Sequence, residues 1–464
     1  MINAEVITGD SQGDFRGATL DSRRIGGGEL FFAVAGEQTD GHRFVADALG
    51  KGAAGAVVEA PFLRAQPEVL ETWVGAGGPV LRVESGLDAL HDLTAAVRRE
   101  VPERLVAITG SAGKTTTKEM LAEILSSRFK VAKSPGNFNN LYGFPLALLG
   151  IANDTEWMVA ELGMSEAGEL GQLSRLASPD VAVITNVAPA HLEFFGSLRA
   201  IADAKSEILE GLSSNGLLIA NADDEEVIRI ASRHPGRTVF FGRSPKAHVR
   251  AEAIEGAPSG GPGSRFDLVV MGRRVPVELP LFGLYNVDNF LAAAACGWAL
   301  GLSLEDIAAA APRISGESGR GAVHPLPAGG TLIDDSYNSN PAAVAKSLDS
   351  AAQLSASRRW VVLGDMLELG PSAEAYHLQA GRAAARLGFE PVVAIGNFRE
   401  AVSLGAAGEG ARTLTFADAD AAMAPVLEEL QEGDLLLVKG SRGVRLDTLV
   451  TAVLAQELGE EQEG

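Results

Sequence analysis

The chain has 464 residues, of which 46% are hydrophobic, and it carries a formal net charge of −21. At about 150 residues per domain this length predicts three domains, and the acidic charge argues against nucleic acid or an anionic membrane surface as a partner. Cys296 is the only cysteine, which excludes an intramolecular disulfide and a cysteine-rich zinc site and fits a reducing compartment. The sequence shows no signal peptide and no apolar run of about 18 residues, so we expect a cytoplasmic protein without stable membrane insertion.

Residues 1–102 form the first expected domain. Short apolar runs alternate with amphipathic helical runs here and along most of the chain, a pattern typical of α/β proteins with parallel sheets. Strands are expected at 29–34, 54–59 and 80–83, and helices near 44–51 and 87–99.

Residues 103–313 form the second expected domain. Its predicted strands lie at 105–109, 157–161, 181–186 and 217–220, and helices are expected near 287–300 and 304–311. Alternating polar and apolar residues over 249–282 predict an antiparallel hairpin at the edge of the sheet. The run EGAPSGGPGSR is expected to be a loop within that hairpin.

Residues 314–464 form the third expected domain, which begins where PRISGESGRG interrupts the alternating pattern. The runs TLIDD, WVVLGD, PVVAIG and DLLLVKG are predicted strands with helices between them. This order predicts a second doubly wound, Rossmann-like sheet. No repeat of 20–50 residues is present.

An anion-binding loop is predicted where the strand at 105–109 meets the next helix. The sequence there contains G-x-x-G-K-T rather than the general G-x-x-x-x-G-K-[ST], whose first glycine would fall at Ile108. Small residues let backbone N–H groups surround phosphate oxygens, and the helix N-terminus adds positive potential. Lys114 would reach the terminal phosphates and Thr115 would coordinate Mg²⁺. The alternative, a glycine turn with a solvated lysine, is disfavoured by the strand before the loop and the helix after it.

This loop predicts that the central sheet is of the P-loop ATPase type. The expected nucleotide contacts from the loop and the start of its helix are Gly110, Ser111, Ala112, Gly113, Lys114, Thr115 and Thr116.

Two strand ends supply candidate metal ligands. Glu161 ends the strand at 157–161, and His191 follows the strand at 181–186. Strand carboxyl ends converge on the ligand-binding edge of such sheets, so beside a phosphate loop these residues favour a metal site. Taken singly, Glu161 is a surface carboxylate and His191 a structural histidine. Lys205, on the following helix, is from the sequence alone a solvated lysine.

Further polar clusters are candidates for binding residues. GNFNN at 136–140 is either a plain turn or a contact for phosphates or substrate. DDSYNSNP at 334–341, GDMLELG at 364–370 and KGSRG at 439–443 follow predicted strands of the third domain. The residues before Pro341 are compatible with a helix-capping turn, but such clusters after three parallel strands are more typical of a binding rim.

Together these motifs resemble those of the Mur ligases, ATP-dependent amide-forming enzymes of bacterial cell-wall precursor synthesis. TGSAGKTT, ELGMSEAGEL, TNVAPAHLEFFGS, AKSEIL, YNVDN, DDSYNSNP and GDMLELG occur in the family's order and span the chain. DDSYNSNP and GDMLELG are similar to the members that join D-alanyl-D-alanine to UDP-N-acetylmuramoyl-tripeptide. The resemblance implies ATP and Mg²⁺ as cofactors and these two small molecules as substrates.

The resemblance also implies roles for individual residues. LDSRRIGGGELFFAVAGEQTDGHRF matches the family's motif for the UDP end of the substrate, with candidate contacts from Ser22, Arg23, Asp40, Gly41, His42 and Phe44. The residues that would surround the nucleotide are Asn286, Asn289, Arg320 and Asp335. Tyr337 and Asn338 would lie near the incoming dipeptide or the nucleotide.

The catalytic residues implied by the resemblance are Lys114, His191 and Lys205, and the metal ligands are Thr115, Glu161, His191 and Lys205. In the family, the lysine that matches Lys205 can be carbamylated by CO₂. Two positions depart from the pattern. Tyr285 stands where relatives commonly have histidine, which puts an adenine contact there in doubt, and Ser339 replaces the usual alanine.

A ligase of this kind would convert the substrate carboxylate to an acyl phosphate, which the amine of the dipeptide then attacks. Two other functions stay open: a Mur- or folylpolyglutamate-type ligase with another amino acid or acceptor, and a non-catalytic nucleotide-binding regulator. We expect a monomer that binds no nucleic acid.

Overall fold

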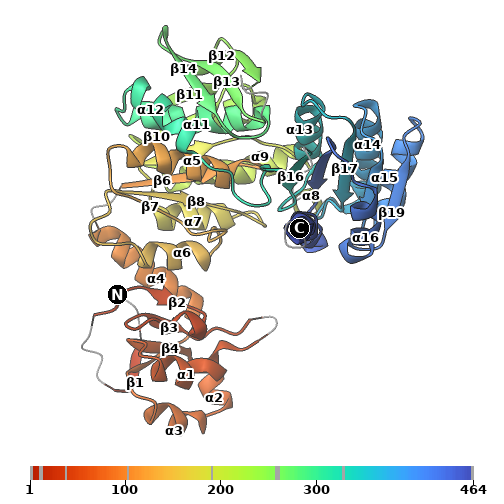
Figure 1. Cartoon of the computed structure of the whole chain (residues 1–464). Coiled ribbons are helices and arrows are strands. Elements are labelled where there is room, and N and C mark those ends of the chain that lie inside the picture. The colour runs from red at the N-terminus through yellow and green to blue at the C-terminus, as the bar shows by residue number, and fades with distance from the viewer. Residues whose placement is uncertain are drawn as a thin grey trace.

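The computed structural model describes residues 4–9, 14–36, 39–101, 104–189, 192–256, 262–326 and 330–460. These residues form three α/β units that follow one another along the chain, each built on its own sheet (Figure 1). The expected α/β fold class with three sheets is confirmed.

Within the described ranges, no helix is both long enough and apolar enough to cross a membrane.

The N-terminal unit carries a five-stranded sheet in the order β1-β5-β4-β3-β2. Its elements are β1 (Glu5–Thr8), β2 (Ala18–Thr19), η1 (Ser22–Arg24), β3 (Leu30–Phe32), η2 (Gly41–Phe44), α1 (Val45–Gly50), β4 (Gly55–Glu59), α2 (Ala60–Ala65), α3 (Val69–Val74), β5 (Val80–Val83) and α4 (Gly86–Glu100). β3, β4 and β5 lie within the expected strands. The antiparallel β1 and the two-residue β2 were not predicted, because one is largely exposed and the other too short to show a periodicity.

The central unit carries a nine-stranded sheet in the order β14-β13-β12-β11-β10-β9-β6-β8-β7. Its strands are β6 (Arg104–Thr109), β7 (Val131–Lys133), β8 (Trp157–Glu161), β9 (Val181–Ile184), β10 (Leu217–Asn221), β11 (Arg237–Gly242), β12 (Val249–Gly256), β13 (Ser264–Val270) and β14 (Arg273–Leu279). β13 and β14 form the expected antiparallel hairpin at the edge. Part of the loop EGAPSGGPGSR lies outside the described residues.

The helices of the central unit cover both faces of its sheet. They are α5 (Lys114–Ser126), α6 (Gly143–Leu149), α7 (Glu169–Ala177), α8 (Leu192–Phe195), α9 (Leu198–Ser206), η3 (Glu207–Glu210), α10 (Glu225–Ala231), α11 (Leu284–Ala299), α12 (Leu304–Ala310) and η4 (Ala311–Arg313). In β6, Val106 and Ile108 join the core made with α5 and α11, whereas Leu105 and Ala107 join the core made with α6, α7 and α9. This two-residue alternation buries both faces of the strand.

The C-terminal unit carries a six-stranded sheet in the order β15-β16-β20-β17-β18-β19. Its elements are β15 (Ala322–Pro325), β16 (Thr331–Asp335), α13 (Pro341–Ala352), β17 (Arg359–Gly364), η5 (Gly370–Ser372), α14 (Ala373–Arg386), β18 (Val392–Ile395), α15 (Arg399–Ala407), β19 (Thr413–Phe416), α16 (Ala419–Glu429), β20 (Leu435–Lys439), η6 (Arg442–Val444) and α17 (Asp447–Glu460). The four predicted strands are β16, β17, β18 and β20, and they pair in parallel. The antiparallel edge strand β15 and the outer strand β19 were not predicted.

Neighbouring units contact each other through packed apolar side chains and through a backbone hydrogen bond. Leu90 and Leu93 of α4 lie in one apolar cluster with Leu149 of α6, which joins the N-terminal and central units. The Glu193 N–H in α8 donates to the Glu368 carbonyl, 3.2 Å away, which joins the central and C-terminal units. In Figure 1 the N-terminal unit lies below the central unit and the C-terminal unit lies beside it. Residues at the carboxyl ends of β9 and β10 line one cavity together with residues of the C-terminal unit.

Candidate active site

The predicted anion-binding loop lies between β6 and α5, as the sequence indicates. Gly113 is the N-cap of α5 and has a φ of +81°, a left-handed conformation that glycine adopts without strain. A Cβ on Gly113 would lie 3.0 Å from the Asn289 Cγ and closer still to its carboxamide oxygen. Glycine at this position is therefore required both by the turn and by the close approach of α11.

The end of β9 holds the loop in place. The Ser111 N–H donates to the Asn186 carbonyl at 3.0 Å, and the Ala112 N–H donates to the Asn186 Oδ1 at 3.0 Å. The Ala112 carbonyl accepts from the Thr185 hydroxyl at 2.7 Å. Thr185 and Asn186 leave the strand, which ends at Ile184 and not at Asn186 as predicted. Their side chains are thus free to turn toward the loop.

Lys114 lies at the first position of α5, and its Nζ donates to the Gly110 carbonyl at 2.9 Å. Burial lowers the pKa of Lys114, although the Glu161 carboxylate raises it and Arg320 lowers it further. Both charged neighbours belong to the predicted site. Lys114 is therefore near both the Glu161 carboxylate and Arg320, in the region where the terminal phosphates of a bound nucleotide are expected.

Thr115 and Glu161 form the candidate metal site. The Thr115 hydroxyl donates to Glu161 Oε2 at 2.7 Å, and the Asn139 amide donates to Glu161 Oε1 at 2.8 Å. One hydroxyl and one buried carboxylate are hard oxygen donors, and Mg²⁺ is commonly held by one or two carboxylates with substrate phosphates and water. These residues therefore fit Mg²⁺. Within the part of the chain that the structure describes, no group of three His, Cys, Asp or Glu side chains could hold a metal ion alone.

His191, the other predicted metal ligand, lies outside the described residues. Lys205 is on α9 and only 2% exposed, so the solvated lysine suggested by the sequence alone is wrong. Its side chain has no hydrogen-bond or ion-pair partner among the described residues. Burial lowers the pKa of Lys205 well below its usual value, and the nearby charge of Lys114 lowers it further.

A cavity of about 530 Å³ lies between the central and C-terminal units. The structure brings predicted residues from both units into its wall, namely Ser111, Ala112, Gly113, Thr116, Asn289, Arg320, Asp335 and Asn338. The cavity continues over the ends of β10 and β11, where it is lined by Asn221, Asp223, Asp224, Phe241 and Arg243. These last residues were not predicted, although NADD directly after a buried strand is the same strand-end signal that identified Glu161.

The start of α11 contributes two buried amides. The Asn286 side chain donates to the Phe282 carbonyl at 2.8 Å, and the Asn289 side chain donates to the Asn286 Oδ1 at 3.0 Å. This chain of bonds fixes Asn289 against Gly113. Tyr285 also lines the cavity, with its hydroxyl close to Gly321, and burial raises the pKa of Tyr285 well above its usual value.

Asp335 binds two side chains in the part of the cavity wall that the C-terminal unit forms. Its Oδ2 accepts from the Ser347 hydroxyl at 2.6 Å and from the Lys439 ammonium at 2.7 Å. Lys439 also donates to the Asn338 carbonyl at 3.1 Å, which holds the turn after β16. Asn340 caps α13 by accepting from the Ala343 N–H at 2.9 Å, so the expected capping turn is present. Asp335, Asn338 and Asn340 also line the cavity.

Two guanidinium groups lie against the ring of Tyr337. The Arg320 Cζ is 4.1 Å from the ring centroid, and the Arg442 Cζ is 5.4 Å from it. Such contacts place cations at the face of the aromatic ring. The arginine of KGSRG, Arg442, is thereby brought next to a predicted substrate-side residue.

The N-terminal candidates lie on two turns that follow the parallel strands β2 and β3. Arg23 is exposed and pairs with Asp21 at 2.8 Å, whereas Ser22 is buried and Phe44 exposed. Asp40 caps η2 by accepting from the His42 N–H at 3.0 Å.

The His42 side chain makes its contacts within the N-terminal unit. Its Nδ1 lies 2.6 Å from Asp40 Oδ1, its Nε2 accepts from the Glu59 N–H at 3.0 Å, and its ring stacks on Phe62. In this conformation the imidazole orders the turn rather than offering a free nitrogen. Gly41 is required there because a Cβ would lie 2.8 Å from the Val34 backbone.

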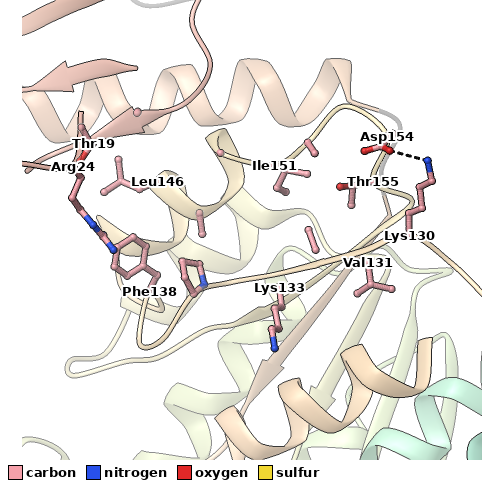
Figure 2. Close-up of a pocket in the computed structure, with 16 residues that line it drawn as sticks. Thr19, Arg24, Lys130, Val131, Lys133, Phe138, Leu146, Ile151, Asp154 and Thr155 are labelled. Carbon is pink, nitrogen blue, oxygen red and sulfur yellow. Dashed lines mark hydrogen bonds and ion pairs between the residues drawn. The ribbon is translucent and has the colours of Figure 1, made fainter. Parts of the chain in front are cut away.

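A second cavity, of about 590 Å³, lies between the N-terminal unit and the edge of the central sheet (Figure 2). Figure 2 shows Arg24 reaching the ring of Phe138, 5.5 Å from its centroid, and Lys130 paired with Asp154 at 2.7 Å. The six N-terminal residues predicted to contact substrate do not line this cavity as described.

Three family models match the chain. The Mur ligase family catalytic domain matches residues 14–98, the Mur ligase middle domain matches 108–297, and the Mur ligase glutamate ligase domain matches 319–442. The chain is 35% identical to the UDP-N-acetylmuramoyl-tripeptide–D-alanyl-D-alanine ligase of Escherichia coli K12, over 97% of this chain and 96% of that one. It is 32% identical to the enzyme of the same name from Bacillus subtilis 168, over 95% and 94% of the two chains.

Solved structures agree with these matches. MurF from Acinetobacter baumannii superposes with a TM-score of 0.85 at 31% identity, over 98% of this chain and all of that one. The MurF ligase of Thermotoga maritima, solved in complex with ADP, superposes with a TM-score of 0.80 at 27% identity, over 96% and 98% of the two chains. Sequence and structure match along nearly the whole length, and the chain therefore belongs to the Mur ligase family.

Proposed function

We propose that this chain is an ATP-dependent ligase that joins D-alanyl-D-alanine to UDP-N-acetylmuramoyl-tripeptide. The product is UDP-N-acetylmuramoyl-pentapeptide, a precursor for peptidoglycan synthesis. The observation that carries the proposal is the full-length identity of 35% to a ligase named for these two substrates. The cavity between the central and C-terminal units, with a phosphate loop in its wall, supports the nucleotide part of the assignment.

The reaction proceeds in two steps. The carboxylate of the tripeptide substrate takes the γ-phosphoryl group of ATP and becomes an acyl phosphate, while ADP leaves. The amine of D-alanyl-D-alanine then attacks the carbonyl carbon, a C–N bond forms, the nitrogen loses a proton, and inorganic phosphate is expelled. Lys114 and the loop amides position the phosphates and stabilise their charge. Closure of the C-terminal unit excludes water, which would otherwise hydrolyse the acyl phosphate.

Mg²⁺ is assigned to Thr115, Glu161, His191 and Lys205. When bound, it would neutralise charge on the phosphate oxygens. Lys205 takes part as a carbamate: its neutral amine attacks CO₂, an N–C bond forms, and the nitrogen loses a proton. The burial of Lys205 and its lowered pKa support this assignment, because they favour the neutral amine.

We assign the substrates to three domains, which comprise residues 1–102, 103–313 and 314–464. The N-terminal domain takes the UDP end at the two turns that carry Ser22, Arg23, Asp40, Gly41, His42 and Phe44. His42 orders its turn, and Arg23 is the exposed cation suited to a diphosphate. Nucleotide contacts in the cleft come from Asn286, Asn289, Arg320 and Asp335, beside the phosphate loop. Tyr337 and Asn338 lie on the side of the dipeptide or the nucleotide. We assign the enzyme to the cytoplasm, where ATP and UDP-linked precursors are made, as a monomer that binds no nucleic acid.

The test is product formation by the purified chain. ATP, Mg²⁺ and UDP-N-acetylmuramoyl-tripeptide, with either diaminopimelate or lysine as third residue, are mixed with D-alanyl-D-alanine or with single amino acids. We expect phosphate release that requires both substrates, with the pentapeptide as product by mass spectrometry, and loss of release in Lys114→Ala. Ligation of a single amino acid instead of the dipeptide would assign the chain to another activity of the family. No dependence on either substrate would favour a non-catalytic regulator.

A further inference from the structure

Lys118 is a buried lysine that the phosphate chemistry does not use. It lies on α5, one helical turn after Lys114, and its side chain is 0% exposed. Its Nζ donates to the Ser134 carbonyl at 2.7 Å and to the Gly136 carbonyl at 3.3 Å, and it lies 3.2 Å from Glu119 Oε1. An ammonium has three N–H donors, so each donor has an oxygen acceptor.

A buried charge of this kind is poor evidence for a role in stability. Removing a lysine from water costs several kcal/mol before its contacts return anything, and apolar replacements of buried ion pairs are often neutral or stabilising. What a lysine supplies that an apolar residue lacks is directed donors. Here two of them hold backbone carbonyls of residues 134–136, which the chain reaches only after passing through β7.

The segment 134–140, which we name the anchor loop, touches Glu161 twice. The Ser134 hydroxyl accepts from the Glu161 N–H at 3.2 Å, and the Asn139 side chain donates to Glu161 Oε1 at 2.8 Å. The Asn139 carbonyl also accepts from the Gly163 N–H at 2.7 Å. The anchor loop therefore holds both the backbone and the carboxylate of the candidate metal ligand.

The opposite side of the anchor loop faces the N-terminal unit. Phe138 lies under the Arg24 guanidinium (Figure 2). Lys133, just before the loop, pairs with the same Glu119 that contacts Lys118. The anchor loop thus contacts α5, the end of β8 and the N-terminal unit. The buried ammonium of Lys118 makes the hydrogen bonds between the loop and α5.

We propose that Lys118 is a positioning residue: by anchoring residues 134–140 it holds Asn139 against Glu161 and sets that carboxylate for Mg²⁺. The inference rests on the proposed assignment of Glu161 as a metal ligand. Without the Lys118 donors the Ser134 and Gly136 carbonyls lose their partner, the anchor loop shifts, and Glu161 loses the hydrogen bond that orients its second oxygen. The nucleotide itself remains held by the phosphate loop, whose contacts come from Thr185 and Asn186 after β9 and not from the anchor loop.

The test compares Lys118→Met with Lys118→Arg in the full chain. Met keeps the length and apolar stem but removes the charge and donors, whereas Arg keeps both. Mn²⁺ binding in the presence of ADP is measured by electron paramagnetic resonance, together with ADP binding in EDTA. We expect Lys118→Met to weaken Mn²⁺ binding at least tenfold and to change ADP binding in EDTA less than twofold, with partial recovery in Lys118→Arg. Lys130→Met, which removes an exposed paired lysine nearby, is the matched control and should leave both constants within twofold.

Asn139→Ala provides a second route, because it cuts the link between the anchor loop and Glu161 without uncovering a buried charge. If Lys118 acts through Asn139, the double variant should bind Mn²⁺ no more weakly than the worse single variant, since coupled residues are not additive. Folded Lys118→Met with wild-type Mn²⁺ affinity would overturn the proposal, and so would multiplied effects in the double variant. If Lys118→Met does not fold, Asn139→Ala with wild-type affinity overturns it.

Failure of the proposed function would be seen separately. Wild-type chain that binds Mn²⁺ and ADP but does not ligate D-alanyl-D-alanine leaves the role of Lys118 intact and refutes the substrate assignment.

Discussion

Gly113→Ala is the sharpest single perturbation of the phosphate loop. The new methyl group would meet Asn289, at 3.0 Å from its Cγ and closer to its carboxamide oxygen. Asn289 cannot simply swing away, because its amide is bonded to Asn286, which is bonded in turn to the Phe282 carbonyl. The loop must therefore move away from α11 to relieve the overlap.

Two costs follow from this geometry. A left-handed backbone costs a residue with a Cβ about 1–2 kcal/mol, and this part should appear as lost stability. Restoring an ordinary carbon contact of about 3.5–4.0 Å shifts the loop by roughly 0.5–1 Å, and more to clear the oxygen. A misplacement of about 1 Å in a catalytic arrangement costs on the order of 100-fold in rate, or about 2.7 kcal/mol of barrier.

Gly168→Ala is the matched control. Gly168 is also a left-handed N-cap, with a φ of +89°, but a Cβ there would have nothing within 4 Å. Both variants should lose similar backbone free energy in chemical denaturation, whereas only Gly113→Ala should lose about 100-fold in kcat/KM for ATP. A Gly113→Ala enzyme within threefold of wild type would refute the reasoning. Equal losses in both variants would show that backbone strain, and not Asn289, decides the effect.

Three further outcomes are expected. Lys205→Arg should be inactive in a ligation assay, because a guanidinium cannot be carbamylated. Lys205→Ala should be partly rescued by formate or acetate, because a small carboxylate can replace the carbamate. A near wild-type rate in Lys205→Arg would contradict the carbamate assignment. Arg23→Ala should raise KM for the UDP-linked substrate about tenfold, whereas the ADP affinity measured by calorimetry should not change. Equal weakening of substrate binding and ADP binding would count against the N-terminal assignment. His377 accepts from the Met366 N–H at 2.8 Å, and burial lowers its pKa, so below about pH 6.5 the unfolded chain binds a proton that the folded chain does not. The free energy of unfolding should fall by up to about 1.4 kcal/mol per pH unit as pH drops through that range, and His377→Gln should remove this slope; an unchanged slope would contradict the role of His377.

Local chemistry allowed the positions of several candidate residues in the fold to be predicted. The place of the glycine loop between β6 and α5 could be predicted because glycines, a lysine and a threonine between an apolar strand and a helix favour only a few backbone paths. Glu161 could be placed because a carboxylate that ends a buried strand lies at the edge where parallel strands bind ligands. The alternation of β6 between two cores follows from its side-chain period.

Other features depend on which distant segments meet, and side-chain periodicity carries no information about that. The pattern of β20 indicates a buried strand but not that it inserts between β16 and β17, because strand order is decided by the packing of the connecting helices. Asn289 against Gly113 and Lys439 on Asp335 likewise join segments far apart in the chain.

Lys118 and Lys205 show most clearly what the sequence determines and what depends on the tertiary structure. By composition each is an ordinary helix-surface charge, since lysine is rarely buried. The sequence by itself predicted that each lies on a helix, Lys118 on the helix after the glycine loop and Lys205 on the helix after His191. Only the tertiary structure decided that both are buried, because burial depends on which distant segments cover the helix: for Lys118 the Ser134 and Gly136 carbonyls come from beyond β7, and Lys205 is only 2% exposed.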